Sequence, residues 1–193
     1  AVGYNALNVN TASGNTAVGA SALAANTSGS GNSAFGQSAL DANTTGNNNV
    51  AVGKDALGVN TTGDKNLALG AFALDANTTA DDNTAVGYGA LTSNTTAAAN
   101  TAIGKGTLGN NTTGANNTAV GYQALDSNQD GGQNVAVGYN CLGVNTASNN
   151  TAVGTNAASA TTTGTQNVAV GKDSLRLNTT ANNNTALGYY SLY

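Results

Sequence analysis

Residues 83–99 read NTAVGYGALTSNTTAAA, and residues 100–116 repeat the pattern as NTAIGKGTLGNNTTGAN. The unit continues in both directions with the consensus N-T-A-V-G-Y-x-A-L-x-x-N-T-T-G-x-x. Measured between the glycines of the A-V-G triplets, successive units are 16 or 17 residues long from Gly3 to Gly188. Internal periodicity is considered first because it decides the architecture. The sequence predicts a single repetitive domain over residues 1–193, with no linker or second domain.

Each position of the unit keeps one kind of residue. Ala stands two residues before the glycine, and Val, Phe, Leu or Ile stands one before it. Leu recurs four residues after the glycine and Asn seven after it, with Ala158 and Thr161 as the exceptions. The constant glycines are expected to adopt a positive φ or to let a neighbouring backbone approach closely. These repeat glycines are Gly19, Gly36, Gly53, Gly70, Gly87, Gly104, Gly121, Gly138, Gly154, Gly171 and Gly188.

The period fits one coil of a parallel β-solenoid or β-roll, since helical repeats run from about 33 residues upward. T-A-V is expected to form one strand, the Y-x-A-L segment a second strand, and N-T-T-G-x-x-N the outer turn. Stacked strands lie about 4.8 Å apart, so about eleven coils would give a rod of roughly 50 Å. The absence of Pro agrees with this, because each coil needs its N–H groups to bond the next.

The repeated positions also predict an interior and a polar ladder. Valine and leucine are expected to fill the core, at Val18, Leu23, Val52, Leu57, Val86, Leu91, Val120 and Leu125. The asparagine four residues before each glycine is expected to stack from coil to coil and to bond turn backbone. This ladder comprises Asn15, Asn32, Asn49, Asn66, Asn83, Asn100, Asn117, Asn134, Asn150, Asn167 and Asn184.

Two features predict self-association. The T-A-V strand has small or apolar residues on both faces, and such strands are usually buried on both. One face would line the coil, and the other needs a partner, most simply another copy of the chain. The sequence also begins and ends within a repeat, without the capping ends that solenoids need. We therefore expect a fragment of a longer fibre, assembled as a homotrimer or filament.

The composition excludes several classes of function. The chain has no His, no Glu, one Cys and a net charge of −4. The residues that most metal sites and acid–base catalysts use are therefore missing. We expect no catalytic residue, no metal, no cofactor and no enzymatic activity. The negative charge disfavours nucleic acid as a partner. No apolar run approaches the ~20 residues of a membrane span.

Individual residues leave alternatives open. Cys141 stands where other units have Ala, which favours a small buried residue over a reactive thiol. The Asp residues are scattered, as in solvated turns, although an isolated cation at Asp130 remains open. The tyrosines after the glycine, such as Tyr88 and Tyr122, favour an exposed position or interface packing over a sugar-binding stripe.

The N-T-T turns suggest two further functions. Threonine pairs such as Thr44-Thr45 would stack into ranks, which is compatible with ice binding, but adjacent side chains point to opposite sides of an extended strand. The same turns contain glycosylation sequons, at Asn26, Asn43, Asn60, Asn77, Asn94, Asn111 and Asn178. Stacking of asparagine side chains needs no glycans, so a structural role is favoured over glycosylation.

The N-T-A-V-G-Y-x-A-L-x-x-N-T-T-G repeats resemble those of phage tail-fibre-like proteins, often ones that end in an endosialidase-type chaperone domain. The N-T-A-V-G segments Asn83–Gly87 and Asn117–Gly121 also resemble the head repeat of trimeric autotransporter adhesins. That adhesin repeat is shorter, so the N-T-T-G turn is a departure. The resemblance implies a homotrimer wound around a threefold axis.

The function expected from sequence is therefore structural. The chain would be the shaft of an extracellular fibre, on a cell surface, a secreted filament or a virion. It would hold a distal tip, outside this sequence, that binds a cell-surface glycan or receptor. An ice-binding solenoid and a single-chain filament subunit that stacks end to end are the alternatives.

Overall fold

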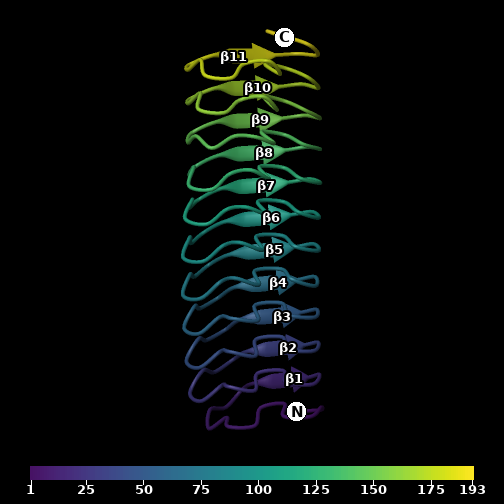
Figure 1. Cartoon of the computed structure of the whole chain (residues 1–193), viewed down its shortest axis with the longest axis vertical. Coiled ribbons are helices and arrows are strands. Elements are labelled where there is room, and N and C mark those ends of the chain that lie inside the picture. The colour runs from purple at the N-terminus through teal and green to yellow at the C-terminus, as the bar shows by residue number, and fades with distance from the viewer.

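The computed structural model describes all 193 residues as a column of stacked coils with eleven short strands and no helix (Figure 1). Each strand pairs in parallel with the next one, so the sheet order follows the chain. The two termini lie at opposite ends of the column (Figure 1). The predicted parallel β-solenoid is confirmed. The strands are β1 (Thr16–Val18), β2 (Ser33–Phe35), β3 (Val50–Val52), β4 (Leu67–Leu69), β5 (Thr84–Val86), β6 (Thr101–Ile103), β7 (Thr118–Val120), β8 (Val135–Val137), β9 (Thr151–Val153), β10 (Val168–Val170) and β11 (Thr185–Leu187).

The alanine at the centre of each strand sets the register. Ala85 of β5 pairs with Ala68 of β4 and Ala102 of β6. The register survives the 16-residue unit between Gly138 and Gly154, where Ala136 pairs with Ala152. The long turn absorbs the missing residue, so the strands remain aligned along the whole column. No helix is present that could cross a membrane.

The repeat glycines meet both conditions that the sequence suggested. Their φ angles lie between 118° and 141°, a region that L-residues rarely adopt. A Cβ added at Gly87 would also lie 2.5 Å from the carbonyl oxygen of Gly104 in the next coil. Glycine is therefore required by both the backbone conformation and the close approach of the next coil.

The segment after each glycine is not the second strand that the sequence predicted. In a typical coil Gln123 and Leu125 both have φ of 52°. The Ala124 N–H donates to the Gly121 carbonyl at 3.4 Å, and the Asn128 N–H donates to the Leu125 carbonyl at 3.2 Å, closing two tight turns. Of the 121 backbone hydrogen bonds only 20 lie within strands, so turns and connecting segments make most of the coil-to-coil bonding.

Alanine and leucine fill the interior. Ala85, Ala90 and Leu91 are all completely buried, and Leu23, Leu57 and Leu125 join them in one continuous cluster. The prediction that valine also lies in the core is wrong. Side chains alternate along a strand, and the central alanine points inward, so both of its neighbours point outward. The misplaced core residues are Val18, which is 39% exposed, and the half-buried Val52, Val86 and Val120.

The core leucines have an unusual backbone. Their φ angles lie between 49° and 53°, a left-handed conformation that costs an L-residue about 1–2 kcal/mol. Burying a leucine side chain contributes about 1.5–3 kcal/mol, which offsets that strain. All coils but the one with Ala158 therefore keep a large side chain at a turn position that glycine or asparagine would fit more easily.

Two columns of buried asparagine run along the rod. In the predicted ladder, Asn100 Oδ1 accepts from the Asn117 N–H at 2.9 Å, and Asn100 Nδ2 donates to the Gly114 carbonyl at 3.0 Å. In a second column, Asn111 Nδ2 donates to Asn94 Oδ1 at 3.0 Å and to the same Gly114 carbonyl at 2.9 Å. The predicted Asn ladder is confirmed, and a parallel ladder holds the other side of each outer turn.

The second asparagine column is interrupted beside the 16-residue unit between Gly138 and Gly154. Asn145 Nδ2 donates to the Ala147 carbonyl at 2.8 Å, and the buried Oδ1 of Asn128 has no hydrogen-bond partner. One coil later Thr161 occupies the column, and its buried hydroxyl has no partner either. The same coil has Ala158 in place of the core leucine. This coil therefore lacks the core leucine and the second-column asparagine of its neighbours, while the first ladder continues through Asn150 and Asn167.

Thr161→Asn is expected to raise the free energy of unfolding by about 1–3 kcal/mol, because it removes a buried unpaired hydroxyl and restores ladder bonds. The new amide would meet the Gly164 carbonyl, as Asn26 Nδ2 meets the Gly29 carbonyl at 2.9 Å after the other short unit. Urea unfolding followed by circular dichroism measures the change. Thr161→Val is the control, since it removes the hydroxyl without restoring the ladder. Equal gains in both variants would contradict a stabilising role of the ladder.

Candidate functional site

The outer face of the sheet carries an unbroken column of bulky apolar side chains. Phe35 and Leu69 are 41% and 43% exposed. A second column, three residues before each glycine, lies beside it and consists of Thr, Val, Leu and Ser. Neither column contains a charged residue. We call this surface the outer strip; its apolar column is Val18, Phe35, Val52, Leu69, Val86, Ile103, Val120, Val137, Val153, Val170 and Leu187.

A row of tyrosine and lysine side chains follows the strands in the adjoining turns. Tyr88, Tyr122 and Tyr139 are all exposed, and the rings of Tyr122 and Tyr139 stack with centroids 5.7 Å apart and planes inclined by 6°. Lys105 Nζ lies 5.9 Å from the ring centroids of both Tyr88 and Tyr122. The sequence-based expectation of an exposed position agrees with this placement.

A hollow of about 240 Å³ lies beside Tyr88 and Lys105. It is also lined by Thr92, Asn110 and Asp126, together with three glycines, Gly89, Gly106 and Gly109. Sequence reasoning missed it, although a signal was present: Gly89 and Gly106 are two successive glycines at a position where most units carry a side chain.

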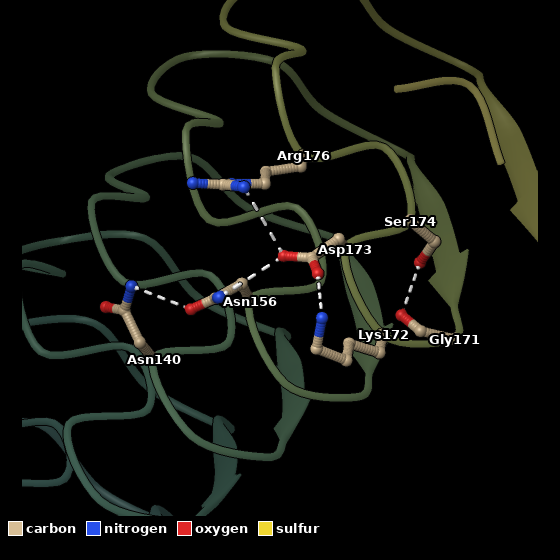
Figure 2. Close-up of polar contacts among 7 residues, drawn as sticks. All are labelled: Asn140, Asn156, Gly171, Lys172, Asp173, Ser174 and Arg176. Carbon is tan, nitrogen blue, oxygen red and sulfur yellow. Dashed lines mark hydrogen bonds and ion pairs between the residues drawn. The ribbon is translucent and has the colours of Figure 1, made fainter. Parts of the chain in front are cut away.

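A polar cluster joins three successive coils near the C-terminal end (Figure 2). The buried Asp173 carboxylate accepts from Lys172 Nζ at 2.6 Å and from Asn156 Nδ2 at 3.2 Å, and Arg176 lies 3.7 Å away. Asn140 Nδ2 in turn donates to Asn156 Oδ1 at 3.4 Å. The hydrogen bond from Lys172 lowers the pKa of Asp173, with Asn156 and Arg176 acting in the same direction. The charged cluster therefore stabilises the fold above the ordinary carboxyl pKa of about 3.9, and this contribution is lost as pH falls through the lowered value.

The single cysteine lies in the core. Cys141 is 0% exposed, and its Sγ lies 3.2 Å from the Ala152 carbonyl oxygen. Burial raises the pKa of the thiol to about 12. The thiolate, which is the reactive form, is therefore suppressed at neutral pH. This agrees with the interpretation of Cys141 as a small core residue.

The acidic residues do not gather around one point. No three His, Cys, Asp or Glu side chains come close enough to hold a metal ion, and Asp130 belongs to no such group. Burial raises the pKa of Asp41 and of Asp75, and the negative charge of Asp55 adds to the effect for both.

Most of the sequon asparagines and the first threonine of each pair are engaged in coil-to-coil bonds. Six of the seven sequon asparagines are 0% exposed, and their Nδ2 atoms donate within the second column, as Asn60 does to Asn43 Oδ1 at 2.9 Å. The first threonine of each pair also donates to the next coil, as Thr44 Oγ1 does to the Thr61 carbonyl at 3.0 Å. The six buried sequon asparagines are therefore not free to carry glycans, whereas the second threonine of each pair, such as Thr79 or Thr96, remains exposed.

Comparisons of the chain with protein-family models, with curated proteins and with solved structures find no match. The functional conclusion therefore depends on the geometry described above.

Proposed function

We propose that the chain is the shaft of an extracellular fibre and that it associates with copies of itself through the outer strip. The observation that carries the proposal is the unbroken apolar column on the outer face of the sheet, from Val18 in β1 to Leu187 in β11. Contiguous exposed apolar patches mark interaction surfaces in soluble proteins. A homotrimer would bury one such strip from each chain.

The mechanical part of the proposal rests on how each coil is held. Backbone hydrogen bonds join successive coils on every side of the column, and both asparagine columns bind the outer turns. Each coil contacts only the coils next to it. Because the same contacts repeat from coil to coil, the rod has the same structure and stiffness along its whole length. A rod of this kind suits a spacer that holds a binding tip away from its base.

The identity of the second copy follows from the chemistry of the strip. A charged partner would find no opposite charge in the two columns of the outer strip. The outer strip of a second copy is apolar and has the same spacing between side chains, so the two strips can pack together along their whole length. β-branched and aromatic side chains are also the residues that pack well on a pleated surface. A second copy is therefore the partner that we propose.

The triple variant Val86→Lys, Ile103→Lys and Val120→Lys is expected to convert the oligomer into monomers of 18.7 kDa. The three lysines would place unpaired charges in the centre of the interface, which is strongly unfavourable. Sedimentation velocity measures the mass, and circular dichroism verifies the fold.

The matched control places three lysines on the outer turns instead, as Thr79→Lys, Thr96→Lys and Thr113→Lys, at positions that are exposed. It should retain the oligomer. A wild-type chain that is monomeric at all concentrations would contradict the proposal, and a mass that grows without limit would favour end-to-end stacking of single chains.

Ice binding is the second candidate, now on a different surface. The sheet presents Thr84, Thr101 and Thr118 in register on the same side as the bulky apolar column. This arrangement supports the candidate better than the Thr pairs of the turns, whose first hydroxyls donate to backbone. Thermal hysteresis of the wild-type chain, lost in the triple lysine variant, would favour ice binding over self-association.

A further inference from the structure

The residues that line the hollow beside Tyr88 lie in the turns that follow β5, β6 and β7. The hollow exists because two successive coils carry glycine where other coils carry a side chain. Gly89 and Gly106 have φ of 62° and 64°. The equivalent residues Ser38, Phe72 and Asn140 adopt nearly the same conformation, with φ between 49° and 60°.

Steric demands do not explain these two glycines. A Cβ at Gly89 would meet no atom within 4 Å, and one at Gly106 would make only an ordinary contact of 3.7 Å with Gln123. The repeat glycine Gly87, in contrast, has no room for a Cβ. The left-handed φ favours glycine at both positions, but other coils carry a side chain in the same conformation, so glycine is not required there, and its lack of a side chain opens the hollow.

The walls of the hollow combine an aromatic ring with unengaged polar groups. The Tyr88 ring stands on one side with Lys105 beside it. The three ion pairs of the structure involve neither Lys105 nor Asp126. Burial alone raises the pKa of Asp126, with no cation to lower it. The hollow thus offers a hydrogen-bond donor and an acceptor, neither of which is paired within the chain.

We propose that this hollow binds a single pyranose ring of a neutral saccharide. The C–H face of the ring would pack on Tyr88, whose side chain has both an apolar face and a polar end. Ring hydroxyls both donate and accept, so the same ligand can satisfy the Asp126 carboxylate, the Lys105 ammonium and the Asn110 amide. A charged ligand fits less well, because the Asp126 carboxylate would repel an anion such as phosphate and the Lys105 ammonium would repel a cation.

The size of the hollow sets the extent of the ligand. Pockets for drug-sized molecules measure about 300–1,000 Å³, so a volume of 240 Å³ suits one ring rather than an enclosed oligosaccharide. The hollow is open to solvent, and the rest of a glycan can therefore extend outward. This site would be on the shaft itself, and it is independent of the proposed self-association.

Saturation-transfer difference NMR on the full chain tests the proposal with three probes: methyl glucoside, methyl galactoside and N-acetylglucosamine. At least one should give a saturable signal. The double variant Gly89→Gln and Gly106→Gln should weaken its binding at least tenfold, because the new side chains fill the hollow. Tyr88→Ala should weaken it as well.

Asn140→Gln is the matched control, since it changes the same position of the repeat in a coil that already has a side chain there. It should leave binding unchanged, and thermal unfolding should show that all three variants are folded. The proposal is overturned if none of the probes binds, if inorganic phosphate competes with the bound sugar, or if the double glutamine variant binds as well as the wild type.

Discussion

Gly87→Ala is expected to lower the free energy of unfolding by about 4 kcal/mol, combining backbone strain of about 1–3 kcal/mol with overpacking of about 1–3 kcal/mol. The φ of Gly87 is 137°, outside the conformations that alanine populates. The new Cβ would lie 2.6 Å from the carbonyl carbon of Gly104, and that atom belongs to backbone that is fixed by coil-to-coil hydrogen bonds. Neither the residue nor its neighbour can move without breaking the stack.

The damage should be local, because a solenoid coil contacts only the coils next to it. Hydrogen exchange followed by mass spectrometry should show faster exchange between residues 70 and 121, while the distant coils keep their protection. Gly89→Ala is the control two residues away. Its Cβ has free space, and its left-handed φ costs about 1 kcal/mol. Equal losses in the two variants would contradict a specific role for the repeat glycine.

The sequence was enough to predict the register of the strands and their parallel stacking. It was not enough to predict which face of each strand points into the core. The spacing of Gly3, Gly19 and their equivalents leaves only one alignment of successive coils. The T-A-V pattern, however, is apolar on both faces, so alternation alone does not say which face is inside. The interior is narrow enough for Ala85 and Leu91 to fill it, and Val86 is excluded to the surface.

The mistaken second strand has a different cause. Y-x-A-L contains residues that suit a strand, and nothing in the residue type of Leu91 indicates a φ of 52°. The left-handed conformation is imposed by the fold, because the chain must reverse within a few residues and still place a large side chain in the core. Tertiary structure overrides local preference here.

Of the two polar features of the rod, the asparagine ladder could be predicted from the sequence and the hollow beside Tyr88 could not. The asparagine ladder could be predicted because one side chain repeated at a fixed period has an obvious partner in the next coil. The hollow at Gly89 and Gly106 depends on what is missing from two units among many, and only the structure shows that Tyr88, Lys105 and Asp126 border the gap. Variation between repeats therefore creates the proposed sugar site, whereas the consensus residues determine the fold.

Asn100→Ala is expected to lower the free energy of unfolding by about 3 kcal/mol. The Asn100 side chain is buried and makes two bonds, accepting from the Asn117 N–H at 2.9 Å and donating to the Gly114 carbonyl at 3.0 Å. Each lost bond removes about 1 kcal/mol, and the N–H left unpaired in the interior adds a desolvation penalty of about 1–3 kcal/mol. The Gly114 carbonyl keeps its second donor, Asn111 Nδ2, so its share of the loss is small.

The outer turn is the part of the coil that should respond first. Without Asn100, the turn around Gly114 retains one of its two amide donors, and its backbone should exchange hydrogen faster than the β6 strand. Asn110→Ala is the matched control, because Asn110 is exposed and makes no side-chain hydrogen bond within the chain, so its change should stay within about 0.5 kcal/mol. Urea unfolding of the two variants measures the difference. A loss in Asn100→Ala no larger than in Asn110→Ala would mean that the backbone bonds alone hold the coils together, and that the asparagine columns only fill space.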